Sequence, residues 1–103
     1  MNFTIKDRLI LLRILPNSGS LSEMVDLMDL AKNLKLSDEE KADISYKEDG
    51  KGTITWDVTK EPNKQFDLTS DQVKLLKNAV KKLDEEKQIT LYTVETMLKI
   101  QNL

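Results

Sequence analysis

The sequence predicts an α+β fold that is mostly helical, with about five helices and one β-hairpin inserted after the third helix. Two observations lead to this prediction. Apolar residues recur every three or four positions along most of the chain, as they do on one face of a helix. Between residues 43 and 57 the spacing changes to alternation around a glycine-containing turn, which is typical of paired strands. The resulting order of elements resembles that of a winged-helix domain.

The first helix is predicted between Thr4 and Pro16. Thr4 and Asp7 form a capping pattern, and Pro16 cannot continue a helix. Apolar residues occupy nearly every face of this segment, so we expect a central helix that is buried on several sides. Leu11 and Ile14 are candidates for an interaction surface or for pairing across a homodimer axis, although burial inside the monomer explains them equally well.

A second helix is predicted to start at Ser20 or Ser22 and to run to about Lys35. It carries a broad apolar arc, in which we interpret Met24 and Met28 as core residues. The alternative is a methionine-lined binding groove.

A short third helix is predicted after Ser37, whose hydroxyl can cap it, while the acidic residues 38–40 complement its dipole. Residues 49–52 then supply a turn that tolerates positive φ angles. The alternating residues beside this turn predict the inward face of the hairpin, namely Ile44, Tyr46, Ile54 and Trp56.

The last third of the chain predicts two more helices. A polar connector with a short extended piece at 65–68 precedes Thr69, which opens a long helix with Gln72 as its capping partner. Thr90 is predicted to cap a final helix through residues 91–98. Three lysines lie on the polar face of the long helix and are a candidate contact for phosphate or an acidic protein, although such a stripe is ordinarily just a solvated face. They are Lys74, Lys77 and Lys81.

The composition excludes several kinds of chemistry. The chain of 103 residues is long enough for a single domain, residues 1–103. It has neither histidine nor cysteine, which argues against hydrolytic triads, zinc sites and disulfides, and fits a reducing cytoplasm. Its three glycines build no nucleotide-binding loop. Charges interrupt the apolar run near the N-terminus, so we expect no membrane segment there.

The charge distribution disfavours nucleic acid as a partner. The net charge is -2, and residues 37–50, which correspond to the recognition helix and the start of the wing, hold six acidic residues against two lysines. A phosphate backbone would be repelled there. The acidic cluster itself is interpreted as a solvated helix start, since consecutive helical acids do not converge on one metal ion.

Several short motifs spread over the chain suggest a family. The segments "TIKDRLILLRILPNSGS", "LSDEE", "ITWD" and "KKLDEEKQIT" resemble a group of small, mostly uncharacterised phage and prophage proteins of about 100 residues. The resemblance implies a phage or mobile-element origin. It carries no assigned catalytic residue.

The sequence therefore predicts a non-enzymatic protein-interaction module without cofactor or metal that acts in the cytoplasm on a protein partner. The resemblance implies an accessory protein of the phage type. The alternative is a winged-helix-like regulator that binds DNA, which rests on the order of elements alone.

Overall fold

A computed structural model describes residues 1–62 and 64–103. Within these residues the chain forms five α-helices, one antiparallel hairpin of two strands and one 3-10 helix. In chain order the elements are α1 (Ile5–Ile14), α2 (Leu21–Leu34), α3 (Asp38–Asp43), β1 (Lys47–Glu48), β2 (Ile54–Thr55), η1 (Val58–Lys60), α4 (Ser70–Glu85) and α5 (Val94–Gln101). The predicted class, α+β and mostly helical with a hairpin after the third helix, is confirmed.

Capping boxes start α1 to α4 at the residues that the sequence singled out. The Thr4 hydroxyl accepts a hydrogen bond from the backbone N–H of Asp7, whose carboxylate accepts one in return from the N–H of Thr4. Equivalent boxes begin α2 at Ser20, α3 at Ser37 and α4 at Thr69. Each cap is typically worth about 1 kcal/mol, so the helix starts are encoded locally.

The start of α5 differs from the prediction. The cap residue is Thr93 instead of Thr90, and residues 90–93 form a turn in which the Thr90 carbonyl accepts the N–H groups of Thr93 and Val94. The Thr93 hydroxyl accepts the N–H of Thr90 at 3.0 Å, which fixes this turn. Leu91, predicted inside the helix, is therefore 95% exposed.

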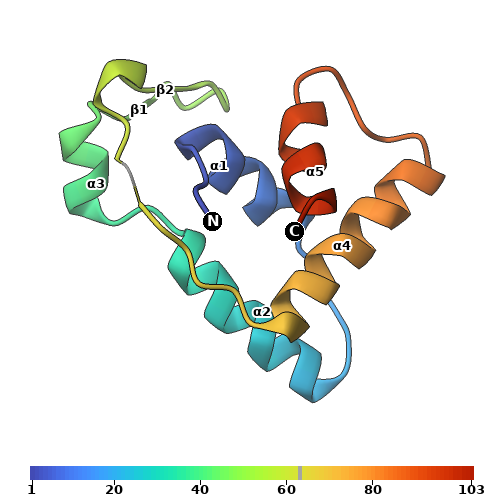
Figure 1. Cartoon of the computed structure of the whole chain (residues 1–103). Helices are drawn as coiled ribbons and strands as arrows, with labels where there is room; N and C mark the ends of the chain where they lie inside the picture. Colours follow the sequence, from blue (N-terminus) through green and yellow to red (C-terminus); the bar gives the residue numbers. More distant parts are fainter. Residues whose placement is uncertain (63) are drawn as a thin grey trace.

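Helices α1, α2, α4 and α5 form the larger part of the molecule, called here the helical body. Figure 1 shows α1 in the middle, α2 below it, and α4 and α5 together on one side. The described helices pack in the pairs α4–α5, α2–α4, α1–α2 and α1–α5. No helix in the described part of the chain combines the length and apolarity needed to cross a bilayer.

The body encloses the main core, which also includes two phenylalanines outside the helices. Its buried members are Phe3, Ile10, Leu11, Leu30, Leu34, Phe66, Leu76, Val80, Met97 and Ile100. Met28 was predicted to belong to this core, but it is 51% exposed. The reason is that α2 turns Leu27 and Leu30 inward, and Met28 follows Leu27 by about 100° around the helix.

Residues 36–60, with α3, the hairpin and η1, form a smaller part on the other side of α1, called here the hairpin lobe (Figure 1). Its buried apolar residues are Leu36 and Ile44, which meet Ile5 of α1; Tyr46 and Trp56 pack partly buried against them. Ile44 was predicted in a strand but is the C-terminal cap of α3. It is nevertheless fully buried, so its predicted inward orientation is correct.

The hairpin is shorter than the alternating pattern predicted, because each described strand has only two residues. Its turn has the expected chemistry. Gly50 and Gly52 adopt φ angles of 75° and 90°, a region that glycine enters without steric cost. The Asp49 carboxylate accepts the N–H groups of Lys51 and Thr53, which closes the turn.

The connector from η1 to α4 returns along the body. Gln65 forms an isolated antiparallel bridge with Asn2, and the Phe66 N–H donates to the Met1 carbonyl at 2.9 Å. Phe66 packs against Phe3 with ring centroids 5.4 Å apart. The short extended piece predicted at 65–68 thus corresponds to a single bridge at Gln65, which pins the connector beside the start of α1.

Candidate protein-binding groove

Helices α4 and α5 pack against each other and against the core without covering all of their apolar side chains. On α4, Leu76 and Val80 are buried, and on α5 Met97 and Ile100 are buried. Leu98, on α5, remains 50% exposed. Apolar surface in water is unfavourable, so an apolar side chain left open beside a concavity is a candidate for contact with a ligand or partner.

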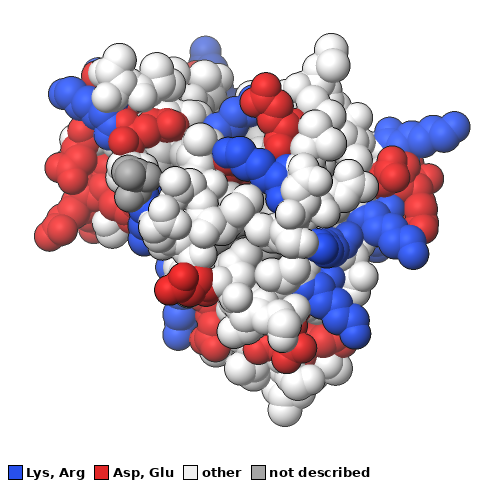
Figure 2. Space-filling model, in the orientation of Figure 1, with Lys and Arg blue, Asp and Glu red and all other residues white. Residues whose placement is uncertain are grey.

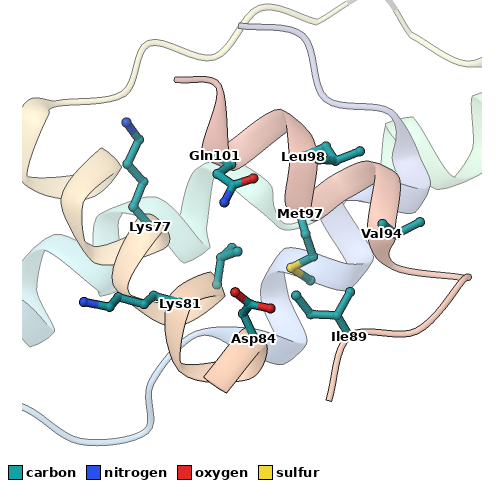
Figure 3. Close-up of a pocket in the computed structure, with 9 residues that line it drawn as sticks. Lys77, Lys81, Asp84, Ile89, Val94, Met97, Leu98 and Gln101 are labelled. Atoms are coloured by element: carbon teal, nitrogen blue, oxygen red, sulfur yellow. The ribbon is translucent and has the colours of Figure 1, made fainter. Parts of the chain in front are cut away.

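A groove of about 450 Å³ lies between these two helices. Figure 3 shows its walls: Lys77, Lys81 and Asp84 project from α4, and Val94, Met97, Leu98 and Gln101 from α5, with Ile89 near one end. Five of the nine lining residues are apolar, namely Val80, Ile89, Val94, Met97 and Leu98. The groove thus joins an apolar floor to a polar rim.

The structure divides the three lysines that the sequence grouped. Lys77 and Lys81 line the groove, and the Lys77 ammonium donates to the Leu103 backbone carbonyl at 2.6 Å. Lys74 lies instead at a hollow between α2 and α4, which Glu23 and Asp26 also line. Only Lys77 and Lys81 therefore share a surface with exposed apolar residues.

The two candidates on α1 do not form an exposed surface. Leu11 has no exposed area and is part of the main core, because α1 lies between the other helices of the body and the lobe. Ile14 is partly buried against the same core. The prediction that Leu11 belongs to an interaction surface is wrong, and burial inside the monomer accounts for it.

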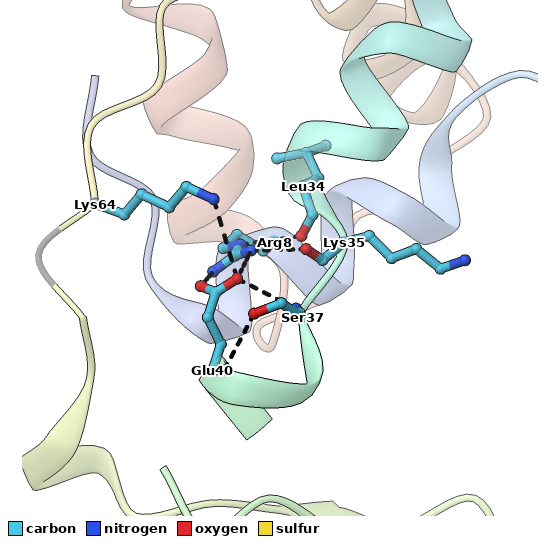
Figure 4. Close-up of polar contacts among 6 residues, drawn as sticks. All are labelled: Arg8, Leu34, Lys35, Ser37, Glu40 and Lys64. Atoms are coloured by element: carbon cyan, nitrogen blue, oxygen red, sulfur yellow. Dashed lines mark hydrogen bonds and ion pairs between the residues drawn. The ribbon is translucent and has the colours of Figure 1, made fainter. Parts of the chain in front are cut away.

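Arg8 is the largest fully buried side chain among the described residues. Figure 4 shows its guanidinium between the end of α2 and the start of α3. It donates to the backbone carbonyls of Leu34 and Lys35 at 3.0 Å, and to both carboxylate oxygens of Glu40 at 2.6 and 3.2 Å. Lys64 approaches the same carboxylate at 4.0 Å. Arg8 thus caps the C-terminus of α2 and holds α3 beside it.

Glu40 combines this ion pair with its place in the α3 capping box, where it accepts the N–H of Ser37. The hydrogen bond from Arg8 is the main cause that lowers the pKa of Glu40 to about 2, against the opposing effect of burial. Glu40 therefore stays ionised at neutral pH. Its role is structural, since its oxygens face Arg8 and the backbone.

Asp7, the residue before Arg8, forms a second buried polar contact, on the side of α1 that meets α5. It accepts hydrogen bonds from the Thr96 hydroxyl and the Lys99 ammonium, both on α5. Burial by itself raises the pKa of Asp7, but the bonds from Lys99, Thr96 and Thr4 outweigh it and leave the pKa below its ordinary value. Asp7 thereby links α1 to α5.

These buried charges do not form a reactive centre. Among the described residues, every buried side-chain nitrogen and oxygen has a hydrogen-bond partner. No described group of three or more acidic side chains is arranged to hold a metal ion. The buried charges are therefore engaged within the fold, whereas Leu98 of the groove remains half exposed.

Charges are unevenly distributed over the surface. On the face shown in Figure 2, acidic side chains crowd the edge where α3 lies, whereas both basic and acidic side chains extend from the opposite edge, where α4 lies. Asp38, Glu39 and Asp43 of α3 are exposed. The groove is thus located away from the acidic surface of α3, and its own acidic side chain is Asp84.

Comparisons with protein-family models, with curated proteins and with solved structures gave no match to this chain. The resemblance to phage and prophage proteins therefore remains a prediction from sequence motifs.

Proposed function

We propose that this chain is a non-enzymatic protein-interaction module, and that the groove between α4 and α5 is its binding surface. The observation that supports the proposal is the half-exposed Leu98 beside an apolar concavity of about 450 Å³. A partner that covers this surface removes apolar area from water, which is the dominant favourable contribution to most protein association.

The surroundings of the groove add to this support. Val94 and Leu98 are four residues apart on α5, so they lie on one face and extend an apolar stripe along this helix. Leu91 lies in the turn before it. Leu91 is 95% exposed. Such a stripe enlarges the area that a partner can cover beyond the groove itself.

DNA binding is less well supported, although the order of elements resembles a winged helix. The helix in the recognition position, α3, has six residues and begins with three acidic side chains. Glu40 is held by Arg8, but Asp38 and Glu39 point their charge into solvent. A phosphate backbone at this end would meet like charge.

We propose a cytoplasmic location and an accessory role of the phage or mobile-element kind. The lack of cysteine is compatible with a reducing compartment, and the short motifs that resemble phage and prophage proteins support such an origin. Both proposals predict a partner among cytoplasmic proteins of the host or of the mobile element.

Photo-crosslinking in native cells tests the proposed function. A photoreactive amino acid at position 98 should give a specific covalent adduct with a protein, and the same amino acid at position 21 should not. Leu21 is a matched control because it is also an exposed leucine, on α2 and outside the groove. The adduct from position 98 should disappear when Val94→Glu is introduced, because a buried carboxylate opposes docking. Adducts of equal yield from both positions, or from position 21 alone, would place binding elsewhere.

A further inference from the structure

The two walls of the groove carry different charge. The α4 wall has Lys77 and Lys81, four residues apart, with Asp84 beyond them at the end of the helix. The α5 wall contributes the uncharged side chains Val94, Leu98 and Gln101. Residues four apart on a helix lie on the same face, about one turn from each other. Positive charge is therefore spaced along one edge of an apolar channel.

From this geometry we infer, as a step that rests on the proposed function, that the partner presents an acidic amphipathic helix. Its apolar face would fill the groove, and carboxylates one turn apart along one edge of that face would meet Lys77 and Lys81. Helices that bind grooves in this way contact them through apolar side chains spaced three and four residues apart.

A helix fits these walls better than an extended strand does. Both walls are helices whose backbone N–H and C=O groups bond along the helix, so they offer no ladder to a strand. An extended peptide would bury its own backbone groups without partners, at a cost that a helix avoids because its hydrogen bonds are internal.

The charges also predict where along the groove the acidic residues of the partner helix lie. Asp84 lines the groove near Ile89, at the end of α4, and would repel a partner carboxylate there. Lys77 keeps hydrogen-bonding capacity, because an ammonium has three donors and one of them contacts the Leu103 carbonyl. Lys81 makes no ion pair with any described residue. The partner's acidic residues should therefore lie toward the Lys77 end, away from Asp84.

Three stapled helical peptides test the inference directly. They share the same leucine anchors, spaced three and four residues apart, and differ only in two flanking positions one turn apart, which are Glu, Gln or Lys. Fluorescence anisotropy at low salt measures their affinity for the full chain. We expect the Glu peptide to bind about fivefold to tenfold more tightly than the Gln peptide, and the Lys peptide to bind most weakly, because two exposed ion pairs contribute modestly.

The variants locate the effect. In the double variant Lys77→Gln with Lys81→Gln the three affinities should converge, whereas Lys74→Gln, which removes the lysine outside the groove, should leave their order unchanged. Leu98→Glu should weaken all three peptides. Circular dichroism of each variant verifies that the helices remain folded.

Each contrary result has a defined meaning. The inference would be overturned by equal affinities for the Glu and Lys peptides, by no binding of any peptide, or by an order of affinities that survives the double lysine variant. The proposed function would then still be tested separately, by the crosslinking from position 98. Wild-type affinity for the Glu peptide in Leu98→Glu would remove the groove as the binding site, and both proposals would fail.

Discussion

The helical body and the hairpin lobe meet at α1 and are held by different interactions. In the described chain, ten buried apolar residues form the core of the body, whereas the lobe core has three. The lobe compensates with Arg8, whose four hydrogen bonds join α1 to the end of α2 and the start of α3. The stabilisation of the body by apolar packing is distributed over many contacts. The polar contacts that attach the lobe depend largely on one side chain, that of Arg8.

This difference matters for function because the groove belongs to the body alone. Its walls are α4 and α5, and none of its lining residues lies in the lobe. Regions with few buried apolar contacts open at lower free energy than the global unfolding. Loosening the lobe should therefore leave binding at the groove largely intact, which the variants below can measure alongside stability.

Arg8→Ala should have the largest effect. It removes a fully buried charge and leaves Glu40 and two carbonyls without their partner, a change that costs about 3–5 kcal/mol for buried ion pairs. Urea unfolding measures the loss, and hydrogen exchange should show residues 36–60 losing protection first. Arg13→Ala on the same helix is the control, because Arg13 is exposed and should change stability by less than about 0.5 kcal/mol. Retained protection of the lobe in Arg8→Ala would contradict its dependence on this residue.

Core truncations should separate the two regions next. Leu30 and Ile44 both have no exposed area, and each change to alanine should cost about 2–4 kcal/mol. Leu30→Ala should lower the stability of the whole molecule, because the main core joins all four body helices. Ile44→Ala should accelerate exchange in the lobe and leave α4 and α5 protected. Equal loss of protection in α5 for both variants would show that body and lobe unfold as one unit.

Acid should weaken the attachment of α3 through Glu40. Its pKa is lowered from 4.5 to about 2, so its contribution is complete above pH 4.5 and is lost as the pH falls toward 2. Glu40→Gln should cost about 2 kcal/mol at pH 7 and flatten the pH dependence of stability in that window. Glu39→Gln is a matched control, since Glu39 is exposed on the same helix. An unchanged acid dependence in Glu40→Gln would exclude this ion pair as its source.

The sequence predicted best what is encoded locally. The starts of α1, α3 and α4 were predicted correctly, and that of α2 is at Ser20, one of its two candidates. Each cap residue is followed three positions later by Asp, Glu or Gln, and the two form a box. At Thr90 the residue three positions later is Thr93, so the rule was not satisfied. The Thr93 hydroxyl caps the turn instead of a helix.

Long-range contacts could not be predicted in the same way. Arg8 and Glu40 are separated by 32 residues, and Asp7 and Lys99 by 92. The periodicity of α1 indicated a buried helix but not which faces are covered, so Leu11 stayed a candidate both for a surface and for the core. The only sequence signal for these buried contacts was the presence of two adjacent charged residues, Asp7 and Arg8, within the apolar segment that forms α1. The groove depends on how α4 and α5 pack, and therefore only the lysines on its rim could be found from sequence.

Thr96→Val should have the smallest effect and gives the sharpest contrast with Arg8. The substitution keeps the shape of the side chain and removes the hydroxyl that donates to Asp7, which retains its bonds from Lys99 and the Thr4 N–H. We expect a loss of about 1.5 kcal/mol, the lower end for a hydrogen bond to a charged group, because the main core still holds α5 against α1. The pKa of Asp7, followed by NMR titration, should rise toward its ordinary value because one stabilising bond is lost. A loss larger than that of Glu40→Gln would mean that the body depends on its buried polar contact as strongly as the lobe depends on Arg8, and the proposed difference between the two regions would not hold.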